Sequence, residues 1–230
     1  KRAARNPKPP VVPSPLVIPP VLYEGLEFEP LSPRSGAEKK LLTYDASLAR
    51  VEGLGPGYRH ARPAEVFGLV IAGLEGKLTG PLQGVYDNML RSSGEWLSLA
   101  VMYKAGTLHT YLDPVGLRWN GKKYIKGKKF SCTEERQWSL TDIPSQTSVD
   151  LDRFPDELVQ YLYGSSFSDL PEKMRAGNLR AQIYLPSEGI LRPAGRGIFV
   201  RFDVNCNINN RASRGVRRRE NFLQGGPSNE

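Results

Sequence analysis

The sequence predicts an α+β protein: a mostly antiparallel β-sheet core with two preceding helices, two short inserted helices and extended arms at both ends. From Trp96 to Leu112, apolar residues recur at every second position on both sides of a Lys104-Ala105-Gly106 break. This is the pattern of two paired strands with one buried face. Two segments before this block show helical spacing instead, and that combination of elements is typical of the α+β class.

A second pair of strands is predicted around Asn120-Gly121, which lies between the extended segments 117–119 and 122–125. An Asn-Gly pair is a strong hairpin signal, because a type I′ turn needs positive φ at both central residues. A fifth run, from Phe130 to Leu140, closes the block.

The two long helices are predicted from proline and apolar spacing. Pro63 suits a first helical turn, and the residues from Val66 to Leu74 form a broad apolar face. The second helix opens near Pro81, and its apolar positions recur at i, i+3, i+4 and i+7. These positions are Leu82, Val85, Tyr86 and Met89.

The remaining elements are shorter. A short helix is predicted over 37–42, a loop over 53–57 and another loop over 141–154. Short helices are expected to open at Pro155 and Asp169 and to end at Gly164 and Gly177. Further strands are predicted over 181–185, 190–191 and 197–204.

Composition divides the chain into a proline-rich extended arm (1–35), a single α+β domain (36–204) and an Arg/Asn/Gly-rich tail (205–230). Nine of the 19 prolines lie between Pro7 and Pro33. Proline fixes φ and removes a hydrogen-bond donor, so the arm is predicted to be polyproline II. It is also predicted to dock on another subunit through its apolar residues, while the tail is predicted to lack regular structure. The apolar arm residues are Val11, Val12, Leu16, Val17, Ile18, Val21 and Leu22.

The net charge of +8 is concentrated at the N-terminus, in the predicted hairpin and in the tail. Concentrated cations favour a nucleic acid or another acidic surface as partner, because each neutralised phosphate releases counterions. The alternative is that these residues only improve solubility. The predicted polyanion-binding residues are Lys122, Lys123, Lys126, Lys128, Lys129, Arg211, Arg214, Arg217, Arg218 and Arg219.

The sequence predicts no enzyme and no catalytic, cofactor or metal site. His60 and His109 are the only histidines, and neither lies in a nucleophile motif. Cys132 and Cys206 form no C-x-x-C pattern, which favours free thiols in a reducing compartment. Four carboxylates could serve a metal-dependent nuclease, although Glu134 and Glu135 alternate across a strand and the acid-x-lysine element of a restriction-type nuclease is absent after Glu95. The four are Asp113, Glu134, Glu135 and Asp142.

These observations favour a structural subunit of a large assembly, such as a virus particle, a phage particle or a ribonucleoprotein. Its expected partners are other protein subunits, alike or different, and a nucleic acid or another acidic surface. The first alternative is a dedicated nucleic-acid-binding module, in which the hairpin lysines hold phosphates while Trp119, Tyr124 or Phe130 stacks on bases. Those aromatic residues could equally be cross-strand packing partners. A metal-dependent nuclease is the weakest alternative.

The expected location is a virion or an intracellular particle. The longest apolar run, Val66 to Leu74, is too short to span a bilayer, and no secretory signal is recognised.

Overall fold

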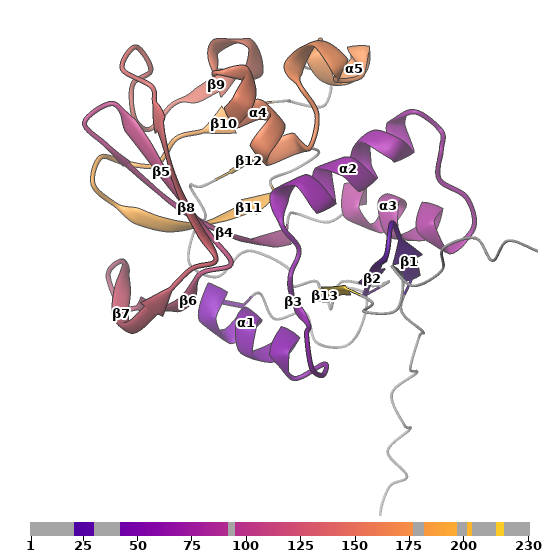
Figure 1. Ribbon diagram of the computed structural model, residues 1–230, viewed down its shortest axis with the longest axis horizontal. Helices are drawn as coiled ribbons and strands as arrows, with labels where there is room; N and C mark the ends of the chain where they lie inside the picture. The colour runs from indigo at the N-terminus through magenta and orange to yellow at the C-terminus, as the bar shows by residue number, and fades with distance from the viewer. Residues whose placement is uncertain are drawn as a thin grey trace, which may run out of the picture.

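The computed structural model of the chain describes residues 21–29, 42–91, 95–176, 182–196, 202–203 and 215–218. Within these ranges, helices and mostly antiparallel strands are combined in one chain, which confirms the predicted α+β class (Figure 1). The helices are α1 (Tyr44–Glu52), α2 (Pro63–Leu74), α3 (Pro81–Arg91), η2 (Leu151–Arg153), α4 (Asp156–Tyr163), η3 (Phe167–Asp169) and α5 (Glu172–Arg175). The strands are β1 (Val21–Tyr23), β2 (Leu26–Phe28), β3 (Arg59–His60), β4 (Glu95–Lys104), β5 (Thr107–Leu112), β6 (Val115–Trp119), β7 (Tyr124–Ser131), β8 (Glu134–Ser139), β9 (Ser148–Asp150), β10 (Gln182–Tyr184), β11 (Leu191–Arg196), β12 (Phe202–Asp203) and β13 (Gly215–Arg218).

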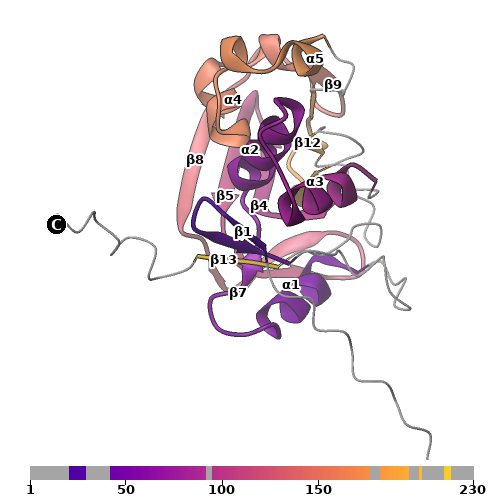
Figure 2. The ribbon, with the colours of Figure 1, turned by 90° about the vertical axis from the view of Figure 1, so that its right-hand side faces the viewer.

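The largest of the described sheets has seven strands in the order β8-β5-β4-β11-β12-β10-β9. Its neighbouring strands are antiparallel, except for the parallel pair β10 and β12. Helices α2, α3 and α4 cover one face of this sheet, while α1 and the β6–β7 hairpin lie at its lower end in the view of Figure 1 (Figures 1 and 2).

Strand β4 is buried on both faces, whereas the sequence predicted one buried face. Leu97, Leu99 and Val101 belong to the main core with helices α2, α3 and α4. The alternate residues Trp96 and Ala100 belong to a second apolar cluster with α1 and the β6–β7 hairpin. Because α1 and this hairpin cover the second face, the residues at alternate positions are buried as well, including the polar Ser98 between Trp96 and Ala100.

The turn between β4 and β5 has the type I′ character that was predicted for Asn120-Gly121. Both central residues have positive φ, 49° at Ala105 and 71° at Gly106. Alanine rarely adopts this conformation, and here its amide donates a hydrogen bond of 2.6 Å to the Glu188 carboxylate. A long-range contact therefore stabilises a turn that its own sequence only weakly predicts.

Helix α2 has the predicted bounds, and α3 begins at the predicted proline. The Glu65 carboxylate accepts a hydrogen bond of 2.8 Å from the Arg62 amide at the start of α2. Gly73 lets α2 approach α3, because a Cβ at this position would lie 2.4 Å from the Tyr86 ring. This contact explains one glycine inside an otherwise apolar helix.

Helix α1 was not predicted from the sequence. The Thr43 hydroxyl caps it by accepting a hydrogen bond of 3.3 Å from the Ala46 amide, and Gly53 ends it. Tyr44 and Val51 face the protein interior. The short helix expected over 37–42 lies outside the described residues, apart from Leu42.

A second small sheet joins segments from the two ends of the chain, in the order β1-β2-β13-β3. Strands β1 and β2 lie in the predicted arm and β13 lies in the predicted tail, so both expectations need correction. Residues 21–28 form a hairpin instead of a continuous extended arm. Residues 215–218 form a strand between β2 and β3, and Val216 is fully buried.

The other residues of the predicted arm and tail sites lie outside the described ranges. These are Val11, Val12, Leu16, Val17, Ile18, Arg211, Arg214 and Arg219. The backbone alone is described at Val21, Leu22, Arg217 and Arg218.

Further along the chain, the predicted loop over 141–154 contains β9 and η2. The two predicted short helices are present as α4 and α5, and α4 ends at Gly164 with a φ of 73°. The strand predicted over 190–191 extends to Arg196, with a register shift after Pro193 because proline cannot donate to the ladder. No helix in the described ranges has the length and apolar character needed to cross a membrane.

Candidate polyanion-binding site

Strands β6 and β7 form a two-stranded sheet, separate from the seven-stranded one, whose last pair before the turn is Trp119 and Tyr124. The Asn120 amide donates a hydrogen bond of 3.1 Å to the Lys123 carbonyl oxygen. The Asn120 side chain accepts hydrogen bonds from the amides of Lys122 (3.0 Å) and Lys123 (2.8 Å). Of these turn residues, only Gly121 has positive φ (89°), so the predicted type I′ turn centred on Asn120-Gly121 is wrong. The turn is centred one residue later, so its two central residues are Gly121 and Lys122.

A register shift adds extra residues to β7 near its far end. Val115 pairs with Ser131, whereas Leu117 pairs with Lys126. Two steps along β6 therefore correspond to five along β7, and Lys128 and Lys129 lie in the extra residues. A bulge of this kind increases the local twist and changes the direction of side chains.

The inner side of the hairpin packs on the second face of the large sheet. Leu117 and Tyr124 are buried in the apolar cluster that contains Trp96 and Tyr111. The Tyr124 hydroxyl also accepts a hydrogen bond of 3.2 Å from the Tyr44 amide at the start of α1. These contacts fix the hairpin to the body of the protein, so its outer side is presented in a defined orientation.

The aromatic residues of the hairpin take part in this packing. The Trp119 and Tyr124 rings are 5.2 Å apart, and Phe130 meets Tyr111 edge to face at 5.7 Å. Such pairs stabilise cross-strand and sheet contacts. This arrangement favours the packing interpretation of these side chains over base stacking.

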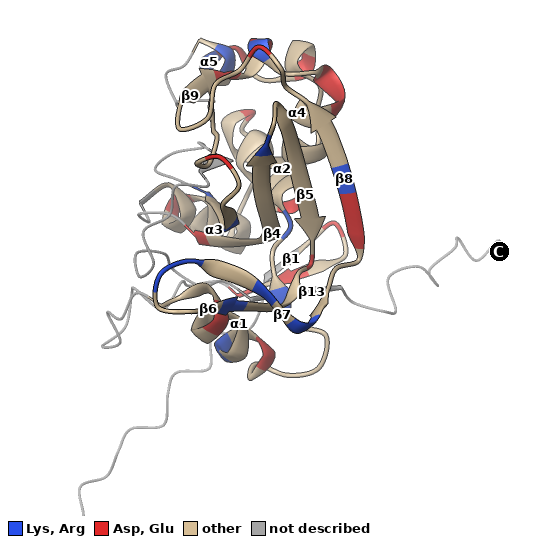
Figure 3. Cartoon of the chain, turned by 90° about the vertical axis from the view of Figure 1, so that its left-hand side faces the viewer, with Lys and Arg blue, Asp and Glu red and all other residues tan. Residues whose placement is uncertain are grey.

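The hairpin is strongly basic along its chain (Figure 3). The predicted lysines of the hairpin, Lys122, Lys123, Lys126, Lys128 and Lys129, are all exposed. Together with Arg118 they give six cations in residues 114–133, a segment of the sequence without a single Asp or Glu. In Figure 3 these cations lie at the turn and again at the far end of β7.

Lys126 differs from the other lysines of the hairpin. Its ammonium nitrogen lies 3.9 Å from the centroid of the Tyr111 ring and 4.8 Å from that of Phe130. A cation–π contact of this kind stabilises the attachment of the hairpin. The ammonium groups of the other four form no ion pair with any residue that the structure describes.

The predicted tail site is only partly described. Strand β13, which holds Arg217 and Arg218, lies at the same end of the molecule as the basic hairpin (Figures 1 and 3). The fold thus brings the C-terminal basic segment, far away in sequence, to the end that carries the hairpin.

Two of the four carboxylates that could serve a nuclease, Asp113 and Glu134, are in ion pairs. Arg62 pairs with Asp113 at 2.5 Å, Thr133 donates to Asp113 at 2.9 Å, and Arg136 pairs with Glu134. Burial by itself would raise the pKa of Asp113, but hydrogen bonds from Arg62 and Ser98 lower this pKa below its ordinary value. Among the described residues, no three His, Cys, Asp or Glu side chains gather closely enough to hold a metal ion.

One polar pair was not predicted from the sequence: Ser47 of α1 and His60 of β3. The Ser47 Oγ and His60 Nε2 atoms are 2.7 Å apart, and both residues are fully buried. Burial lowers the pKa of His60 to about 3, so its imidazole is neutral at physiological pH. A serine beside a histidine can form a nucleophile–base pair, but burial keeps this pair away from any substrate in the structure. Cys132 is a half-buried free thiol.

The fold and this surface define an α+β protein with a basic β-hairpin fixed to its sheet. No protein-family model, curated protein or solved structure matches the chain.

Proposed function

We propose that the chain is a non-enzymatic subunit of a nucleic-acid-containing assembly and that the β6–β7 hairpin is its phosphate-contacting surface. One observation carries the proposal. Residues 114–133 hold six cations and no acid, and the apolar side of the hairpin is anchored, so its exposed lysines other than Lys126 are held on a fixed support and are available to a partner. Surfaces selected only for solubility usually mix both signs of charge.

The contact is expected to be with phosphates and to depend little on base sequence. Tyr124 is buried, and Trp119 and Phe130 are partly buried and engaged in ring contacts, which leaves these side chains poorly placed to stack on bases. Lysine is a flexible point charge that suits phosphate contact and carries little base information. A dedicated sequence reader is therefore less well supported than a general phosphate-binding surface.

Binding of the full chain to labelled nucleic acid tests this proposal. Fluorescence anisotropy would compare a DNA duplex, single-stranded DNA and single-stranded RNA of unrelated sequences at low salt. Replacing Lys122, Lys123, Lys128 and Lys129 together with Gln is expected to weaken binding at least about 100-fold, since about four phosphate contacts are lost. Binding that changes less than about threefold would overturn the proposal, because each lost contact carries a large electrostatic contribution at low salt.

A double hairpin variant, Lys122→Gln with Lys123→Gln, is compared with a control of equal charge to separate this effect from net charge and from misfolding. Lys104 and Lys173 are exposed lysines outside the hairpin, and their double replacement with Gln is expected to leave binding nearly unchanged. The melting temperature of every variant should stay close to that of the wild type, because these side chains make no ion pair with the described residues.

A further inference from the structure

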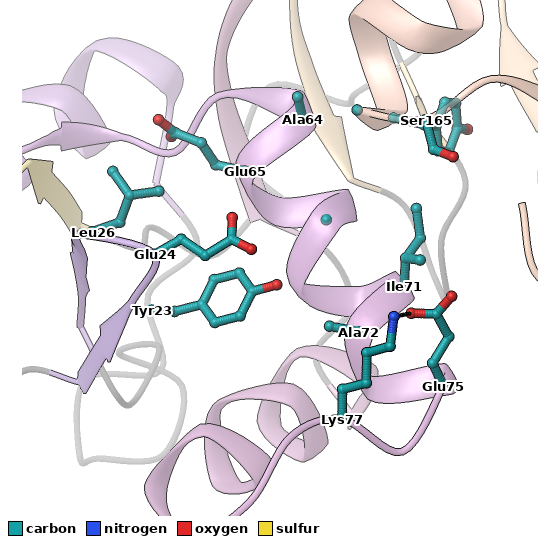
Figure 4. Close-up of a pocket in the computed structure, with 13 residues that line it drawn as sticks. Tyr23, Glu24, Leu26, Ala64, Glu65, Ile71, Ala72, Glu75, Lys77 and Ser165 are labelled. Carbon is teal, nitrogen blue, oxygen red and sulfur yellow. Dashed lines mark ion pairs between the residues drawn. The ribbon is translucent and has the colours of Figure 1, made fainter. Parts of the chain in front are cut away.

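A groove of about 530 Å³ runs along the exposed side of helix α2 (Figure 4). The β1–β2 turn forms one wall and the end of α4 forms the other. The residues that define it include Tyr23, Glu24, Gly68, Ile71, Ala72 and Gly164. Its volume is in the range of sites that hold ligands or short peptide segments.

The floor of the groove is open down to the helix backbone. Ala64, Gly68 and Ala72 are spaced four residues apart and therefore lie on one side of α2. A Cβ added at Gly68 would have no atom within 4 Å, whereas a Cβ at Gly73 would meet the Tyr86 ring at 2.4 Å. Glycine weakens a helix relative to alanine. Packing against α3 explains Gly73, but no contact among the described residues explains Gly68.

The rim combines an aromatic ring with acidic groups. The Tyr23 ring is turned toward α2 in Figure 4. Glu65 pairs with Arg59 and Glu75 with Lys77, whereas Glu24 forms no ion pair with any described residue. An apolar floor with an aromatic wall suits a proline-rich extended segment, which is already ordered before it binds.

We propose that this groove binds residues 11–20 from a second copy of the chain. This segment reads Val-Val-Pro-Ser-Pro-Leu-Val-Ile-Pro-Pro, and four basic residues precede it within the first eight positions. They are charges that the Glu24 carboxylate on the rim would attract. Ten residues of polyproline II span about 31 Å, so part of the segment can lie in the groove while the rest crosses from one subunit to the other.

The direction in which the chain enters β1 favours binding of this segment to a second copy of the chain over binding within its own copy. Residues 11–20 lead into Val21, at the end of the β1–β2 hairpin opposite the turn that lines the groove. To reach its own groove, the segment would have to reverse and pass along the whole hairpin. A neighbouring subunit related by a two-fold axis requires no reversal, and the exchange is then reciprocal.

This inference concerns self-association and does not depend on phosphate contact by the basic hairpin. If it holds, it supplies the subunit contact that the proposed assembly requires. The experiment therefore omits nucleic acid and uses about 0.5 M salt, at which interactions between exposed charges are screened.

Sedimentation velocity of the full chain, over a range of protein concentrations, gives the self-association constant. Gly68→Leu should fill the groove and weaken association at least about tenfold, as an overfilled contact does. Gly84→Leu is the matched control, since Gly84 also lies in a helix with open space around a Cβ. Association is expected to stay at the wild-type level in this control. Both variants should melt at or above the wild-type temperature, because leucine favours a helix over glycine.

A mixing experiment tests the pairing itself. Changing Val17 and Ile18 to Asp should weaken association as much as Gly68→Leu does. Combining this arm variant, which keeps a free groove, with Gly68→Leu, which keeps a normal arm, should restore association above that of either variant alone. The inference is overturned if the wild type is monomeric throughout, if Gly68→Leu associates normally, or if the mixture associates no better than its components.

Discussion

Gly116 and Gly127 face each other across β6 and β7, and neither position has room for a side chain. A Cβ on Gly127 would lie 2.8 Å from the Gly116 carbonyl oxygen. A Cβ on Gly116 would lie 2.8 Å from the Lys129 carbonyl oxygen. This close backbone approach produces the register shift that carries Lys128 and Lys129, so two glycines determine where part of the basic surface lies.

Gly116→Ala is expected to destabilise the protein and to weaken nucleic-acid binding. Gly116 has a φ of 74°, and the atoms that its Cβ would meet belong to the backbone and cannot move aside. The positive φ alone costs about 1–2 kcal/mol for a residue other than glycine. Urea denaturation should show a loss at least this large, and wild-type stability in this variant would contradict the bulge geometry.

Gly121→Val is expected to lower stability through the backbone alone. The residue has a φ of 89°, and a Cβ there would meet no atom within 4 Å. A β-branched side chain strongly resists positive φ, so the loss should be about 1–2 kcal/mol and the melting temperature should fall by about 2–8 °C. Gly121→Asn should lose less, because asparagine tolerates this region. Equal melting of the valine variant and the wild type would place the turn elsewhere.

Val216→Asp tests whether the C-terminal segment belongs to the fold. Val216 is fully buried between β2 and β3, so a carboxylate there should cost at least about 3 kcal/mol. Val115 is 52% exposed, and Val115→Asp is the matched control, expected to change stability by less than about 0.5 kcal/mol. Similar denaturation curves for the two variants would mean that residues 215–218 do not complete the small sheet.

His60 should make the protein sensitive to mild acid. Its pKa is about 3 in the folded state, below the ordinary value of 6.5, so the folded state favours the neutral imidazole. The contribution of the neutral imidazole to the free energy of unfolding is fully present above pH 6.5. It is lost as the pH falls toward 3, by about 1.4 kcal/mol per pH unit. Between about pH 7 and pH 5 the wild type should lose about 2 kcal/mol more than His60→Gln in urea denaturation. An equal loss in both proteins would show that the imidazole is not buried in its neutral form.

Local patterns predicted most of the secondary structure. Helix α2 has the predicted bounds, because a proline start and a continuous apolar face are signals contained within the segment itself. The end of α4 at Gly164 was predicted for the same reason. Helix α1 has a capping Thr43 and a terminal Gly53, but its apolar face is weak, so these end signals alone did not predict it.

Features that depend on distant contacts could not be predicted. The small sheet joins β2 and β13 from opposite ends of the chain, and neither strand has a local signal strong enough to reveal its partner. The buried pair of Ser47 and His60 exists only because β3 lies beside α1. At the candidate site the lysines were predicted from charge alone, but the packing of Trp119 and Phe130 depends on the second face of the sheet.

The central claim is that the hairpin lysines contact phosphates, and the salt dependence of binding tests it most directly. The logarithm of the affinity of the full chain for duplex DNA would be measured against the logarithm of salt concentration. Each lysine that contacts a phosphate contributes about one unit of slope, so replacing Lys122 and Lys123 with Gln should reduce the slope by about two. The same change at Lys104 and Lys173 removes equal charge outside the hairpin and should leave the slope unchanged. Equal effects of the two double variants, or an unchanged slope in the hairpin variant, would contradict the assignment of this surface.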